Sequence, residues 1–219
     1  SSIDFEQVSF MPQRQRRYGQ GWNGTHVSYE NGGWGAEFDG VVRPVGLAQA
    51  DGSYFMAPYS SIEDNIKEFF TTGTVFQNGV SISGGNPEDG YVLLSANKQN
   101  TEFVVENDEL VRNSFLFRAG KKFGKWTVDG NVNYISSRTE TTSSSLYTDL
   151  LQTATNIPVE LFANSGNEGH WTSYYRNPYW LRDNIRNTNR SDYMSGIVTL
   201  NYEINKHINV NYVSNVQFS

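Results

Sequence analysis

Apolar and polar residues alternate along several stretches of the chain, and residues 125–137 (KWTVDGNVNYISS) show the pattern most clearly. Apolar residues from Trp126 to Tyr134 occupy every second position, and polar residues from Thr127 to Asn133 occupy the positions between them. Successive side chains of a strand point to opposite faces, so this segment is predicted to be a strand with one apolar and one polar face. The alternation alone does not tell whether the apolar face contacts a soluble core or lipid.

The same alternation recurs along the chain and predicts about seven strands. The predicted strands lie within residues 1–10, 74–83, 91–98, 112–123, 125–137, 192–204 and 208–218.

The lengths of the strands and of their connections favour a membrane barrel. Several strands run for about 10 residues or more, which is the length that a tilted strand needs to cross a bilayer. Outer-membrane barrels place short turns on one side of the membrane and long loops on the other. We therefore predict an all-β fold: a segment of a transmembrane antiparallel β-barrel with long extracellular loops. The short connections are 84–90, 120–125 and 205–207, and they alternate with longer ones at 11–73, 99–111 and 142–190.

Two short helices are predicted inside the long connections. Residues 60–73 place Ser61 as an N-cap three residues before Asp64, with apolar residues at helical spacing and a glycine at the end. A second helix is predicted within 144–158, ending before Pro158.

Composition narrows the choice of function. The formal charge of −6 argues against a nucleic-acid partner, because phosphate binding requires a basic surface. The chain has no cysteine, which excludes disulfides and cysteine-based zinc sites. No apolar run approaches the roughly 20 residues of a membrane-spanning helix, so a membrane-spanning form must be a β-barrel.

Candidate chemistry is sparse, and we expect no catalytic, cofactor or metal site and no enzyme activity. GQGWNG (19–24) matches a dinucleotide-binding pattern, but it neither follows a predicted strand nor opens a predicted helix. His26, His170 and His207 are far apart in predicted loops and are expected to be solvated rather than metal-bound. No nucleophile is paired with a recognisable base.

Five segments occur in order along the chain: YGQG (18–21), WG with DG (34–40), DNIKEFFTTGTVFQNGVSISGGN (64–86), NDELVRNSF (107–115) and NPYWLRDNIRNTNRSD (177–192). Together they resemble the segments that follow the plug domain of SusC/RagA-like TonB-dependent transporters. The resemblance covers nearly the whole chain.

The resemblance implies a barrel of about 22 strands in the outer membrane of a Gram-negative cell, filled by an N-terminal plug. It also implies a SusD-like surface lipoprotein as a lid, and import of glycans or peptides with energy relayed by TonB. Residues 1–219 account for about seven of these strands and contain neither the plug nor the TonB-contacting segment that the resemblance implies. We therefore expect residues 1–219 to be the first strands and extracellular loops of a larger barrel.

The resemblance assigns roles to two sets of residues. Aromatic residues of the long connections are candidates to stack on sugar rings or to contact the lid protein, and packing of loop against loop is the simpler role for each. Polar residues on the strands are candidates to face the lumen, where they contact ligand, hydrate the wall or touch the plug. The aromatic set is Tyr18, Trp22, Trp34, Tyr54, Trp171, Tyr174, Tyr175, Tyr179 and Trp180. The polar set is Arg118, Asp129, Asn131, Asn133, Asn209 and Asn211.

Three alternatives stay open at this point. The first is a barrel of this kind that serves as a structural subunit of a larger outer-membrane complex. The second is a soluble β-sandwich that binds carbohydrate through its loop aromatics. The third is a secreted β-rich enzyme, for which the sequence offers no catalytic constellation.

Overall fold

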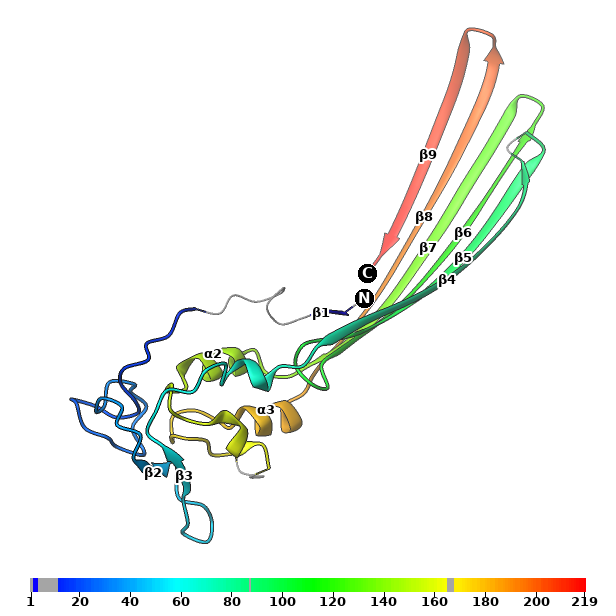
Figure 1. The fold of residues 1–219 in the computed structure, drawn as a ribbon. Helices are drawn as coiled ribbons and strands as arrows, with labels where there is room; N and C mark the ends of the chain where they lie inside the picture. The colour runs from blue at the N-terminus through cyan, green and yellow to red at the C-terminus, as the bar shows by residue number, and fades with distance from the viewer. Residues whose placement is uncertain (1, 4–11, 87, 165–167) are drawn as a thin grey trace.

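The fold is known from a computed structural model, which describes residues 2–3, 12–86, 88–164 and 168–219. It is mostly β-structure, with one long antiparallel sheet and a compact group of loops at one end of that sheet (Figure 1). The all-β prediction is confirmed at this level.

Six long strands and the short strand β1 form the sheet, and all six predicted segments from residue 74 onwards are confirmed. Each neighbouring pair along the chain is antiparallel, and the spatial order is β1-β4-β5-β6-β7-β8-β9. At the start of the chain only Ser2–Ile3 (β1) is described, pairing with Thr74 and Gly73, and the rest of the predicted first strand lies outside the described residues. The long strands are β4 (Gly73–Asn86), β5 (Gly90–Glu102), β6 (Glu109–Phe123), β7 (Trp126–Thr141), β8 (Asn187–Asn205) and β9 (Ile208–Phe218).

The connections separate by length onto the two ends of the sheet. The tight connections β4–β5, β6–β7 and β8–β9 turn at the end far from the loops, while 103–108 and 142–186 lie at the other end (Figure 1). Asn86 organises the first turn, because its side-chain oxygen accepts hydrogen bonds from the backbone N–H groups of Glu88 and Asp89. The predicted alternation of short and long connections is therefore a real separation in space.

Residues 12–72 and 142–186 pack together, and we call them the loop unit. Two apolar clusters fill it, one around Trp171 and one around Leu150. Each cluster combines residues from both segments, so the two connections fold as one body rather than as separate loops. Its elements are β2 (Val42–Val45), β3 (Phe55–Pro58), the 3-10 helices η1 (Lys67–Phe69) and η2 (Val159–Phe162), and the helices α2 (Ser145–Gln152) and α3 (Pro178–Asn184).

The prediction of a helix at residues 60–73 is wrong, because only the three residues of η1 are helical there. Asp64 has a φ of 53°, which a regular helix cannot accommodate. The neighbouring Asn65 is buried. Its side-chain N–H donates a hydrogen bond to the carbonyl of Ile157 at 2.5 Å, and its side-chain oxygen accepts one from the N–H of Val159 at 3.0 Å. These long-range hydrogen bonds replace the local ones that a helix would make.

The other two helical segments also differ from expectation. The helix expected within 144–158 is present as α2 but ends at Gln152, six residues before Pro158. The NPYW segment begins a further helix, α3, in the long connection, where a helix had been predicted only within 144–158. Asn177 caps α3 by accepting a hydrogen bond from the N–H of Tyr179 at 3.0 Å, and Pro178 occupies the first helical position, which lacks a bonded N–H in any helix.

Candidate functional site: a two-faced sheet and its loop unit

One face of the sheet is apolar across all six long strands. The cross-strand partners of Val132 illustrate this, since Phe117 pairs with Val132 and also with Leu94, which in turn pairs with Ile82. Large apolar side chains on this face stay open to the surroundings, with Ile82 exposed by 69%. We call this surface the apolar face. Its exposed members are Phe76, Val80, Ile82, Val92, Leu94, Phe115, Phe117, Phe123, Trp126, Val132, Tyr134, Met194, Val198, Val210, Tyr212, Val216 and Phe218.

Aromatic residues bound the apolar face along the strands. Trp126 lies beside Tyr202 near the hairpin end, with ring centroids 4.4 Å apart, and Tyr134 stacks on Phe115 at 6.4 Å nearer the loop unit. At about 3.3 Å per residue, the interval from Trp126 to Tyr134 measures about 26 Å, or about 20 Å along the normal of a membrane that the strand crosses at a tilt of about 40°. Beyond Tyr134 the same face carries polar residues such as Ser136, Arg138 and Glu140. The apolar surface is therefore a band with aromatic edges.

The opposite face carries the polar residues and is called the polar face. All six residues predicted to share the polar side lie on it, because Arg118 pairs with Asn131, and the registers of β6 to β9 align the others with them. The six residues are Arg118, Asp129, Asn131, Asn133, Asn209 and Asn211.

Two charge pairs join strands on the polar face. Arg118 lies 3.5 Å from Asp129, which also accepts a hydrogen bond from the hydroxyl of Tyr91. Lys122 lies 3.5 Å from Glu203. These side chains are partly exposed, so each pair contributes modestly to stability and mainly fixes side-chain orientation. Tyr91 was not recognised in the sequence, because its role depends on a partner two strands away.

The polar face also has a hollow of about 250 Å³, in the half of the strands nearer the loop unit. Its lining comes from three adjacent strands, β4, β5 and β6. Arg112 is the charged residue in it, and it had not been selected from the sequence, although it has the same parity as Arg118. The lining residues are Gln77, Asn97, Gln99, Arg112 and Ser114.

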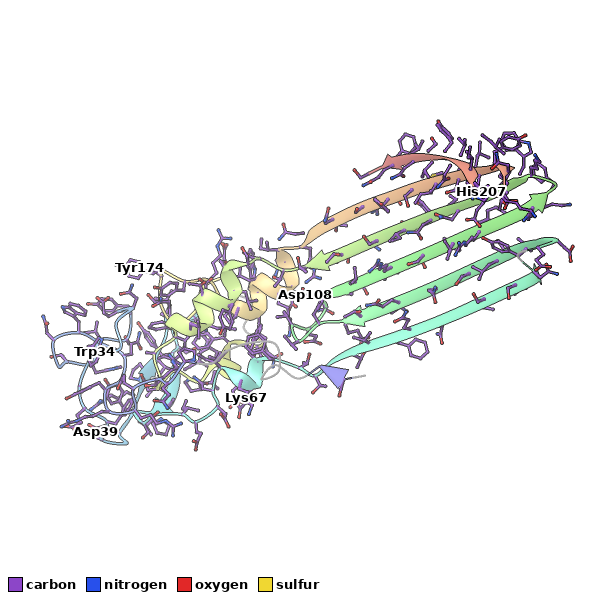
Figure 2. All side chains as sticks on the ribbon, turned by 90° about the horizontal axis from the view of Figure 1, so that it is seen from above. Trp34, Asp39, Lys67, Asp108, Tyr174 and His207 are labelled. Carbon is purple, nitrogen blue, oxygen red and sulfur yellow. The ribbon has the colours of Figure 1, made fainter. Side chains whose placement is uncertain are left out.

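Exposed aromatic side chains gather on the loop unit at the end remote from the sheet. Figure 2 shows Trp34 and Tyr174 at this end, and they are exposed by 61% and 68%. Trp22 is also exposed, and the ring of Tyr18 lies 5.9 Å from that of Trp34. These side chains are free to meet a ligand or partner, and Tyr54 is exposed as well.

The remaining predicted aromatics contribute to packing. Trp171 has no exposed surface and forms part of a core cluster, so it cannot be the surface contact that was predicted. Tyr175 packs against it, with ring centroids 6.0 Å apart. Tyr179 and Trp180, both on α3, are half-buried against the core clusters. The correction has a simple cause: a chain segment as long as 142–186 needs its own apolar core to hold one shape.

The histidines also differ from expectation. His207 is exposed in its turn and His26 is half-buried, but His170 is buried with only 1% of its surface exposed. Its ring meets that of Phe162 edge to face at 4.6 Å, and neither ring nitrogen has a hydrogen-bond partner among the described residues. Burial lowers the pKa of His170 to about 3, because the charged ring would lose its hydration there.

An ion pair holds the loop unit to the sheet. Asp108, at the end of the β5–β6 connection, lies 2.7 Å from the Arg186 guanidinium and accepts a hydrogen bond from the N–H of Thr142 at 2.8 Å. Arg186 also bonds the carbonyl of Asn107. Burial raises the pKa of Asp108, and these donors oppose that rise by stabilising the charged carboxylate. Figure 2 places Asp108 at the junction of the two parts.

Comparison with protein-family models and with curated protein sequences gives no match. Among the described residues, no helix is both long and apolar enough to cross a membrane. In the same part of the chain, no three His, Asp or Glu side chains are grouped so that they could hold a metal ion.

Proposed function

We propose that this chain forms part of the wall and the extracellular loops of a Gram-negative outer-membrane transporter of the SusC/RagA type. In this proposal the apolar face contacts lipid, the polar face lines the lumen, and the loop unit lies outside the cell. The barrel is TonB-dependent and imports glycans or peptides together with a SusD-like surface lipoprotein. The TonB contact and the plug belong to sequence outside residues 1–219.

The observation that carries the proposal is the continuous apolar face of the sheet. A soluble protein seldom exposes an apolar patch larger than a few hundred Å², because water contact with apolar surface costs about 25 cal/mol per Å². Here exposed apolar side chains extend over six adjacent strands and are bounded by aromatic residues. Lipid is an occupant that suits such a band, because outer-membrane barrels present an outward apolar belt between aromatic girdles.

The two ends of the sheet also agree with this role. Short turns suit the periplasmic side and long, folded connections suit the outer side of such a barrel. Exposed Trp22, Trp34 and Tyr174 then point away from the membrane, where aromatic rings can stack on sugar rings or contact the lid protein. No bond of the cargo is broken in this scheme. The chain's residues guide the cargo while displacement of the plug opens the path.

Two other functions compete with transport. A barrel with the same wall but without a TonB-contacting segment in the whole protein would be a structural subunit of a larger outer-membrane complex. A soluble carbohydrate-binding sandwich would have to cover the apolar face with a second sheet. The short connections lie at one end of the sheet and the long ones at the other. This separation favours the barrel over the sandwich, because a sandwich does not sort its loops by length.

Membrane fractionation tests the proposal. We expect the full-length protein to sediment with outer membranes, to resist a carbonate wash, to require detergent for release, and to migrate differently on gels before and after boiling. Release into buffer without detergent would contradict the barrel. A plug-like segment encoded before Ser1 and about 15 more amphipathic strands encoded after Ser219 would further support the SusC-like assignment. Copurification of a surface lipoprotein then tests the partner, and loss of cargo uptake on gene deletion separates a transporter from a structural subunit.

A further inference from the structure

Among the described residues of the polar face, every charged side chain but one has an ion-pair partner. Arg118 pairs with Asp129 and Lys122 with Glu203. Arg112 is exposed on the same face, and within the described ranges its guanidinium has neither an ion-pair nor a hydrogen-bond partner. A guanidinium offers five N–H donors in a planar fork that matches a carboxylate, so an unpaired one beside a hollow is a ready anion site.

The surroundings of Arg112 add hydrogen-bonding groups and no negative charge. On the polar face it lies between Gln99 and Ser137, its direct cross-strand partners, and Ser114 follows two residues along its own strand. The side chains of Gln77 and Ser114 also lack partners among the described residues, so their hydrogen-bonding capacity is available. The hollow thus combines one free cation with several neutral donors and acceptors.

The backbone of β4 makes room for this arrangement. Gly79 is the cross-strand partner of Asn97, and a Cβ at residue 79 would collide with the Asn97 side-chain oxygen. The missing side chain lets the Asn97 amide lie across β4 and form part of the lining. The Asn97 amide donates a long hydrogen bond to the Ser95 hydroxyl at 3.5 Å, and the Gln99 amide donates one of ordinary length to the Thr101 hydroxyl at 3.1 Å.

We propose that this hollow is a binding site for a carboxylated, hydroxyl-rich ligand such as an acidic sugar. Arg112 receives the carboxylate, and the amide and hydroxyl groups of Gln77, Gln99 and Ser114 receive the ligand's hydroxyl groups. A volume of about 250 Å³ suits one sugar-sized unit rather than a long segment. The proposal refines the function given above by assigning a negative charge to the cargo, and its role in transport depends on that function.

Calorimetry on the detergent-purified full-length protein tests the site with a matched pair of probes. Trigalacturonate carries carboxylates, and its fully methyl-esterified form presents the same hydroxyl groups without the charge. We expect trigalacturonate to bind at least about tenfold more tightly than the ester, which is the scale of one charge-assisted hydrogen-bonded contact. Arg112→Gln should remove this preference.

Arg190→Gln is the matched control. It removes the same charge from β8, but on the apolar face, which also carries Met194 and lies opposite the hollow. It should leave binding of trigalacturonate unchanged. Equal binding of the acid and the ester, no binding of either, or an equal loss in both variants would overturn the site. Unchanged gel migration of unboiled Arg112→Gln checks that this variant folds. Charge-selective binding by a protein that needs no detergent would contradict the transporter and leave the binding site intact.

Discussion

At the scale of single residues, His170 shows how the loop unit depends on a neutral buried side chain. The ring is enclosed by Phe162 and Trp171, with centroid distances of 4.6 and 6.5 Å. Because burial holds the pKa of His170 at about 3, the folded loop unit does not bind the proton that the unfolded chain binds near pH 6.5.

This difference predicts a loss of stability in acid. The contribution of neutral His170 to the free energy of unfolding is complete above pH 6.5, where neither the folded nor the unfolded state binds the proton. It falls as the pH decreases from 6.5 towards 3. At pH 5 the loss amounts to about 2 kcal/mol. Urea unfolding followed by tryptophan fluorescence at pH 7 and pH 5 measures it. His170→Phe should abolish this part of the pH dependence, while His207→Gln, at an exposed turn, should retain it. The same pH dependence in both variants would contradict the assignment.

At the scale of secondary-structure elements, strand β7 tests which face of the sheet meets lipid. Val132 is on the apolar face, inside the band between Trp126 and Tyr134 and two residues from Tyr134, and Asn133 is on the polar face opposite Leu116 and Ser195. Val132 and Asn133 are adjacent on one strand, so they lie at nearly the same position along it but on opposite faces of the sheet.

A lysine at each position should therefore have unequal effects. We expect Val132→Lys to destabilise the membrane-inserted protein by about 1–3 kcal/mol, because a cation on the lipid side loses its hydration and this cost falls from the bilayer midplane towards the interface. Asn133→Lys should cost less than about 1 kcal/mol, since its charge stays in water. Folding into lipid vesicles, monitored by the gel shift of unboiled protein, compares the two. A larger defect in Asn133→Lys would reverse the assignment of the faces.

At the scale of the whole molecule, the loop unit and the sheet are joined through the carboxylate of Asp108. This carboxylate links the β5–β6 connection, which contains Asp108, to both ends of the long connection 142–186. It accepts a hydrogen bond from the N–H of Thr142 at the start of that connection and pairs with Arg186 at its end. The neighbouring pair of Glu106 and Arg182 is similar in type, but the Glu106 side chain is 55% exposed.

Replacing Asp108 should loosen the loop unit without unfolding the sheet. Asp108→Ala leaves the Arg186 guanidinium and the Thr142 N–H without this acceptor, and we expect local opening of residues 142–186 to become easier by about 2–3 kcal/mol. Hydrogen exchange of this segment measures the change, with strands β5 to β7 as an internal reference. Glu106→Ala should cost at most about 1 kcal/mol, because exposed ion pairs contribute little. Equal exchange in the two variants would show that Asp108 does not hold the junction.

The sequence by itself determined the long strands, their two faces and the separation of short from long connections. These features follow from the period-two pattern and from local turn residues, which act over a few positions. It therefore predicted that Asp129, Asn131 and Asn133 share a face and that Val132 lies on the other.

Only the tertiary structure decided what depends on distant partners. Trp171 and His170 are buried because residues 12–72 and 142–186 fold around them, and Asn65 bonds across to 157–159 instead of continuing a helix. Likewise, strand register sets Arg112 beside Gln99, and no carboxylate in the described part of the chain pairs with it. Such contacts join residues far apart along the chain, so no local pattern encodes them: burial and pairing are properties of the assembled fold.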